Sequence, residues 1–322
     1  MNERLPSTQC EARQKPKILV PVILFLLTAV TTIVSGATFK GVDPFKNPLR
    51  LIEGLPFSVT LLTILLSHEF GHFFALQRYG IQSSLPYFIP APPFITPGTF
   101  GAIIKSKAQD INKKALLDIG AAGPLAGFIV AIVATIIGLH LSKIVILPAT
   151  VEGDWLGSST IFQILSYLVI GSVSENQGIA LHPVALAGWI GFFITSINLL
   201  PIGQLDGGHI ASALFGKINR AISITMIMLL IILGVFTWPG WLFWALLNSI
   251  LIIKHPHPPL TYDNVIDRKR RVIGWLSLVV FALTFLPSPV CHGSFSKSKT
   301  VLGCKYKIGI MQEKKLRGAP QN

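Results

Sequence analysis

The sequence predicts an all-α polytopic membrane protein, and three observations support this fold class. Of the 322 residues, 51% are hydrophobic and only 13% are charged, whereas a soluble domain carries about 25% charged residues. Apolar runs of about 20 residues recur, which is the length that a helix needs to cross the hydrocarbon core of a bilayer. The net charge is +13, but the basic residues lie in connections and tails, as membrane topology requires. We therefore expect contact with a lipid bilayer and no nucleic acid binding.

The apolar runs predict about six to eight transmembrane helices. Candidate spans are residues 18–38, 55–76, 115–139, 183–203, 221–237, 240–253 and 272–290. The apolar run 161–173 has only 13 residues, so we expect a re-entrant or interfacial segment there. Residues 84–106 place two apolar stretches around a proline-rich turn, which predicts a small membrane-associated β-hairpin.

The basic residues also predict which way the spans run. With a basic N-terminus in the cytoplasm, span 55–76 runs inward, 115–139 runs outward and 183–203 returns. This arrangement keeps the basic connection 77–114 and residues 268–271 on the cytoplasmic side. It places the lysine-rich tail 291–322 on the outside, against the rule.

The motif HEFGH at residues 68–72 lies inside one of these apolar runs. On a helix, His68 and His72 are four residues apart and share a face, so their imidazoles can chelate one Zn²⁺. Glu69 is placed to take a proton from metal-bound water. A histidine in a membrane helix often only packs or donates a hydrogen bond. Three ionisable groups together are expensive there, so we favour a functional site.

A third ligand is expected at the inward end of span 183–203, because a catalytic zinc site takes three protein ligands and leaves one open position. Asp206 is a carboxylate at matching depth, and Pro201 breaks the helix before it. Taken alone, Asp206 is equally well explained as a helix cap, and His209 is a competing ligand.

The two motifs together, HEFGH and the pattern N-x-x-P-x₄-D-G that starts at Asn198, resemble the site-2 proteases, a family of intramembrane zinc metalloproteases. The resemblance covers residues 55–260. It implies His68, His72 and Asp206 as zinc ligands and Glu69 as the general base. It implies that Asn198 holds the substrate backbone or the developing oxyanion. Residues 123–127, GPLAG, are similar to the small-residue motif of the family core, and we interpret them as a helix-packing device.

The resemblance divides the chain into three regions: a tail and first span (1–54), an intramembrane metalloprotease core (55–260), and a last span with a basic tail (261–322). It implies the compact bacterial and plastid branch, because 38 residues between spans two and three are too few for a PDZ domain. We expect a bacterial cytoplasmic membrane, with the active site towards the cytoplasm.

The implied function is hydrolysis of peptide bonds in or near transmembrane segments of membrane proteins, some already cut by another protease. A metal-ion transporter and a catalytically inactive relative that binds membrane proteins are the alternatives. The sequence leaves the oligomeric state open. For His255 and His257 we expect a cytoplasmic turn, with a second metal site as the lesser alternative.

Overall fold

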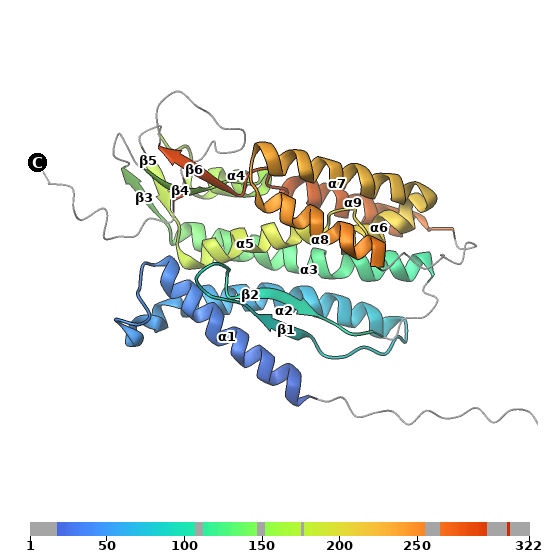
Figure 1. Ribbon diagram of the computed structural model, residues 1–322, viewed down its shortest axis with the longest axis horizontal. Coiled ribbons are helices and arrows are strands. Elements are labelled where there is room, and N and C mark those ends of the chain that lie inside the picture. Colours follow the sequence, from blue (N-terminus) through green and yellow to red (C-terminus); the bar gives the residue numbers. More distant parts are fainter. Residues whose placement is uncertain are drawn as a thin grey trace, which may run out of the picture.

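The structure is a computed structural model that describes residues 18–106, 112–146, 152–174, 177–254, 265–294 and 308–309. It is mostly helical (Figure 1). The helices are α1 (Leu19–Phe39), α2 (Leu55–Arg78), α3 (Lys113–His140), α4 (Thr160–Ile170), α5 (Pro183–Asn198), α6 (Asp206–Phe215), α7 (Asn219–Phe236), α8 (Gly240–Lys254) and α9 (Arg268–Thr284). Two short 3₁₀ helices, η1 (Pro48–Gly54) and η2 (Gly216–Ile218), precede α2 and α7.

Four helical segments are long and apolar enough to cross a membrane, judged by length and composition. Within the part of the chain that the structure describes, they are Leu19–Phe39, Pro48–Arg78, Lys113–His140 and Asp206–Phe236. Three further apolar helices, Thr160–Ile170, Pro183–Asn198 and Gly240–Ile252, are shorter. The chain is therefore an integral membrane protein. These four do not by themselves give the six to eight spans expected from the sequence, and the run 183–203 falls among the shorter helices because it stops being helical at Asn198.

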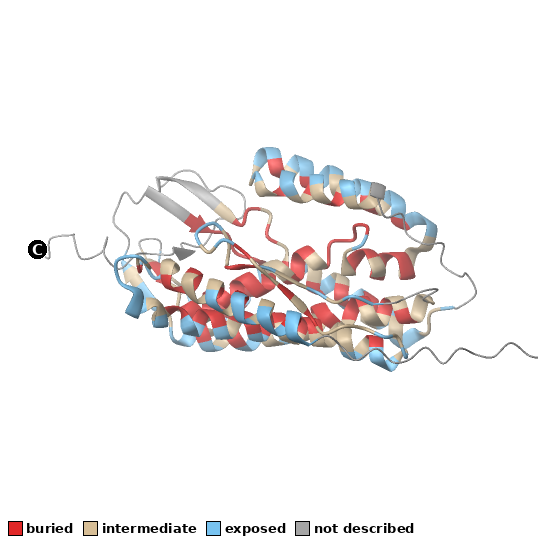
Figure 2. Cartoon of the chain, turned by 60° about the horizontal axis from the view of Figure 1, so that its bottom comes forward, coloured by how far each residue is buried: buried red, intermediate tan, exposed pale blue. Residues whose placement is uncertain are grey.

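The helices α2, α3 and α5 pack closely because α3 presents small residues to its neighbours. Figure 2 shows buried residues on the inward faces of the helices and exposed ones on the outer faces. The buried residues of α3 include Gly120, Ala121, Gly123, Gly127, Ala131, Ala134 and Gly138. Large side chains such as Phe57, Leu61 and Phe192, all fully buried, fill the space beside them. This packing fixes the distance between the helices that carry the predicted site.

The β-hairpin predicted over residues 84–106 is present. Strands β1 (Tyr87–Pro90) and β2 (Thr99–Ile103) pair antiparallel and form a two-stranded sheet. The turn between them is held against α1, because the Thr31 hydroxyl donates a hydrogen bond of 2.6 Å to the Gly98 carbonyl. Gly98 has a φ of 89°, a conformation that suits glycine.

A second sheet shows that the all-α prediction was wrong in one respect. It contains β3 (Lys143–Ile146), β4 (Glu152–Leu156), β5 (Gln177–Ala180), β6 (Val290–Ser294) and β7 (Ile308–Gly309), in the order β3-β5-β7-β4-β6. Each strand is short, and β4 pairs with segments more than a hundred residues away in the sequence. Local patterning carries no signal for such pairing, so the sequence alone does not predict this sheet.

This sheet also shows that the connection through α4 begins and ends at the same end of the molecule. Strand β4 comes before α4 and β5 comes after it, so the chain leaves and re-enters the same sheet. That path agrees with the expectation that the run 161–173 does not cross. After α9, β6 joins the sheet as well (Figure 1). Most of the lysine-rich tail lies outside the described residues, so the side on which it lies stays a prediction.

Candidate metal centre

Two helices bring together three groups that can ligate a metal. Helix α2 supplies His68 and His72, whose Nε2 atoms lie 3.1 Å apart. Helix α6 supplies Asp206, and its Oδ2 lies 3.4 Å from His68 Nε2 and 3.3 Å from His72 Nε2. All three ligand atoms fall within 4.8 Å of one another, and no other group of this kind occurs among the residues that the structure describes. The sequence motifs therefore meet in space, although 134 residues separate His72 from Asp206.

The turn between α5 and α6 delivers Asp206 to the histidines. Helix α5 ends at Asn198, and α6 starts at Asp206 itself, with Leu205 at the cap position. Asp206 is thus not the helix cap that was considered as an alternative. A Cβ on Gly207 would lie 2.0 Å from the Leu199 carbonyl oxygen, so the glycine is required for the turn to close. The α6 N-terminus also favours the negative charge of Asp206.

One backbone carbonyl fixes the orientation of His72. Its Nδ1 lies 2.8 Å from the Ile119 carbonyl oxygen, which can only accept, so Nδ1 carries the proton and donates it. The lone pair of Nε2 then faces His68 and Asp206, as a metal ligand requires. Asn198 also reaches the site, because its Nδ2 lies 3.3 Å from His68 Nε2.

Two glycines of α3 make room for the imidazoles. A Cβ on Gly123 would lie 2.1 Å from His72 Nε2, and one on Gly127 would lie 3.2 Å from His68 Cβ. Residues 123–127 were interpreted as a packing motif, and the structure adds that they pack directly on the two histidines. The equal spacing of the two glycines and the two histidines is the signal that could have revealed this relation.

The donor set fits a zinc ion. His68 and Glu69 are 5% and 7% exposed, so the site lies inside the protein. Two imidazole nitrogens and one carboxylate oxygen are a normal ligand set for catalytic zinc, which keeps a fourth position for water or substrate. His209 is not part of the ligand group within the described residues. It packs closely against α3 instead, because a Cβ added at Gly120 would lie 3.2 Å from the His209 Cβ. His255 and His257 lie outside the described residues.

Fold and site together define a polytopic membrane protein with a metal-binding group buried among its helices. Residues 56–237, more than half of the chain, match the model of Peptidase family M50. The chain belongs to this family, which confirms the resemblance to site-2 proteases that the motifs indicated.

Similar curated proteins come from plants. The chain is 32% identical over 248 residues to "Probable zinc metalloprotease EGY2, chloroplastic" of Arabidopsis thaliana, covering 76% of this chain and 44% of the relative. It is 32% identical over 300 residues to "Probable zinc metalloprotease EGY1, chloroplastic" of Arabidopsis thaliana, covering 84% and 53%. The rice EGY1 protein, from Oryza sativa subsp. japonica, is also 32% identical over 300 residues, covering 84% and 50%. The chain thus spans about half the length of the curated relatives it matches. Their names say chloroplastic, so they give no support to the expected bacterial membrane.

Proposed function

We propose that this protein is an intramembrane zinc metalloprotease that hydrolyses peptide bonds in or near transmembrane segments. The convergence of His68, His72 and Asp206 inside a helical membrane protein is the observation that carries the proposal. Buried ionisable groups are costly among membrane helices, and binding a divalent cation offsets that cost. The matched relatives, named as probable zinc metalloproteases, support the same activity.

His68, His72 and Asp206 would hold the zinc, and Glu69 would move the proton. When bound, zinc acts as a Lewis acid that polarises the peptide carbonyl and makes water more acidic. The Glu69 carboxylate accepts a proton from the attacking water and later donates it to the nitrogen of the leaving amine. Cleavage thus turns a peptide bond and one water into a carboxylic acid and an amine, and returns Glu69 to its ionised form.

Asn198 is suited to bind the reacting carbonyl. Its amide nitrogen is a donor beside His68, at 3.3 Å from Nε2, and can donate a hydrogen bond to the developing oxyanion.

In this proposal the β1–β2 hairpin binds the backbone of the substrate. A transmembrane substrate has its backbone hydrogen-bonded internally, and a two-stranded sheet has edges on which an unwound segment can pair.

We propose membrane protein substrates, including ones already cut by another protease. We place the active site on the side rich in basic residues, which is the cytoplasm of a bacterium or the equivalent compartment of a plastid. The end of α2 and the start of α3, where Arg78, Lys113 and Lys114 lie, support this side. A count of six to eight spans also stays a proposal, since the three shorter apolar helices must be added to the four long ones.

The test compares Glu69→Gln with the wild type on a single-span substrate in liposomes. Glu69→Gln keeps the shape of the side chain and removes the proton acceptor, so we expect zinc to be retained and cleavage to be lost. Glu53→Gln, which replaces a glutamate in η1 outside the ligand group, is the matched control and should cleave normally. Cleavage by Glu69→Gln at the wild-type rate would reject the proposal. Single-span proteins that co-purify with Glu69→Gln from native membranes would identify substrates.

A further inference from the structure

A cluster of polar side chains joins the N-terminal end of α9 to α2 and α3. The Arg270 guanidinium donates to Asp118, with Nε at 3.1 and 3.0 Å from the two carboxylate oxygens. It also donates to the Tyr79 hydroxyl at 3.0 Å and to Asp267 at 2.7 Å. Tyr79 in turn donates to Asp118 at 2.5 Å. These four residues, Tyr79, Asp118, Asp267 and Arg270, are called the Arg270 cluster below.

The cluster sits next to the contact that orients His72. Asp118 directly precedes Ile119, whose carbonyl accepts the hydrogen bond from His72 Nδ1. Tyr79 follows α2 seven residues after His72, which is about two helical turns. The cluster and the His72–Ile119 hydrogen bond therefore join the same two helices at neighbouring levels. A shift of α3 relative to α2 at Asp118 would move the carbonyl away from the imidazole.

We propose that Arg270 is a positioning residue for the metal ligand His72, acting through Asp118, Tyr79 and the Ile119 carbonyl. This inference rests on the proposed function, because it assumes that His72 binds zinc. Arg270 lies beyond residues 56–237, the range that matches the family, so a residue outside this range supports the site. A planar guanidinium that binds a carboxylate through several N–H groups defines an orientation better than a single ionic contact does.

Two further observations favour a positioning role for α9. The basic residues at its start are not equivalent: Arg268, Lys269 and Arg271 are exposed, whereas Arg270 turns inward onto Asp118. The helix also packs on α6, the helix that begins with Asp206, because a Cβ on Gly274 would lie 2.8 Å from a Leu214 methyl group.

The experiment measures zinc affinity of the full chain in detergent, by competition with a chromogenic chelator. Arg270→Gln should bind zinc about 10-fold more weakly, at the low end of the effect seen for groups that orient a metal ligand. Arg271→Gln removes the neighbouring exposed charge and should bind as the wild type does. Tyr79→Phe and Arg270→Lys should cause smaller losses in the same direction. They keep the test decisive if Arg270→Gln does not fold.

The combined variant Arg270→Gln/Asp118→Asn separates positioning from general stability. We expect its zinc affinity to be no weaker than that of Arg270→Gln alone, because both substitutions disconnect the same pathway. The thermal midpoint of the metal-free protein is measured in parallel. A lowered midpoint with wild-type zinc affinity in every variant would overturn the inference and leave only a structural role. A wild-type protein that binds no zinc would instead overturn the proposed function.

Discussion

Helices α3 and α7 are almost equally apolar, yet they contribute to the molecule in different ways. In the 18-residue apolar stretch of the segment Lys113–His140, which is α3, 39% of residues are buried. In the corresponding stretch of Asp206–Phe236, the segment that ends with α7, only 22% are buried. The buried residues of α3 are mostly glycine and alanine, while α7 exposes large side chains such as Met228, Ile232 and Phe236. Hydropathy thus identifies a membrane helix, and residue size shows whether other helices can approach it closely.

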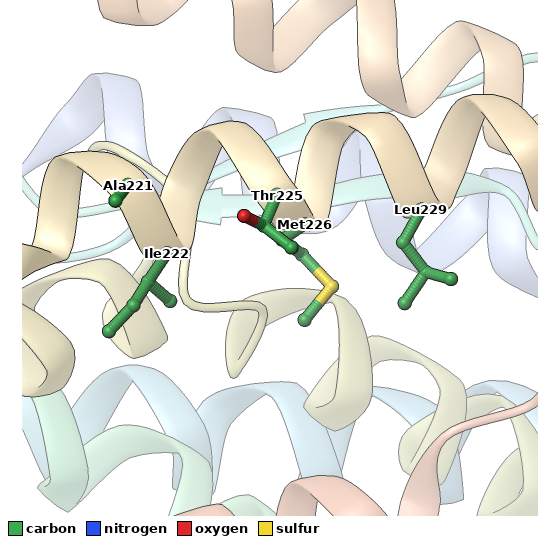
Figure 3. A pocket seen from close by; sticks show the side chains of 5 residues that line it. All are labelled: Ala221, Ile222, Thr225, Met226 and Leu229. Atoms are coloured by element: carbon green, nitrogen blue, oxygen red, sulfur yellow. The ribbon is translucent and has the colours of Figure 1, made fainter.

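The surroundings of α7 illustrate the same difference. One face of this helix borders an open hollow of about 290 Å³, lined by Ala221, Ile222, Thr225, Met226 and Leu229 (Figure 3). No ionisable side chain lines it, and it shares no residue with the metal group. The metal-binding group lies where small residues let helices approach, and the open face of α7 carries none of its residues.

The largest expected effect comes from adding one methyl group to α3. In Gly123→Ala the new Cβ would lie 2.1 Å from His72 Nε2, so the imidazole must leave its position. We expect zinc affinity to fall by at least about 100-fold, with cleavage lost in parallel. Ile129→Ala, on the exposed side of the same helix, should stay within about twofold of wild type. Wild-type zinc affinity in Gly123→Ala, measured by chelator competition, would contradict the close packing of α3 on the site.

A pair of asparagines compares the two regions more finely. Asn198→Ala removes the donor beside His68, and we expect kcat to fall by about 10²–10³ with zinc still bound. Asn248 is buried in α8, where its amide donates to the Trp244 carbonyl at 2.9 Å. Asn248→Ala should lower the thermal midpoint but keep the cleavage rate per folded molecule. Equal loss of kcat in both variants would mean that Asn198 acts through stability alone.

A pair of leucines gives the smallest expected effect. Leu61 in α2 is fully buried, so Leu61→Ala leaves a cavity and should cost about 2 kcal/mol or more of stability. Leu229 in α7 is 41% exposed, and Leu229→Ala should cost less than about 1 kcal/mol. Unfolding in mixed micelles measures both values. Equal losses of unfolding free energy in the two variants would contradict the difference in burial between Leu61 and Leu229.

The parts of the site that depend on local spacing could be predicted from the sequence. The four-residue separation of His68 and His72 and the turn-rich centre of 84–106 each encode their geometry within a short segment. For Asp206, depth and residue type left a ligand and a helix cap equally good, and only the resemblance of its motif to that of a family favoured the ligand. Helix α6, which begins at Asp206, was not expected.

What escaped prediction depends on contacts between distant segments. Arg270 was interpreted as part of a basic topology signal, because nothing near it in the sequence reveals Asp118, which lies 152 residues away. The five-stranded sheet depends on the same kind of contact, since β4 pairs with β6 and β7. The division of the chain at residues 54 and 260 is a prediction that the structure does not test.

Zinc content of the purified protein tests most directly whether the two imidazoles and the distant carboxylate act as one ligand set. We expect the wild type and the control Asp43→Ala, which replaces an aspartate outside the ligand group, to carry one zinc per chain. Asp206→Ala is prepared in the same detergent, and its thermal midpoint verifies that it is folded. This variant should carry almost no zinc. Full zinc occupancy in Asp206→Ala would show that Asp206 is not a ligand and would contradict the account.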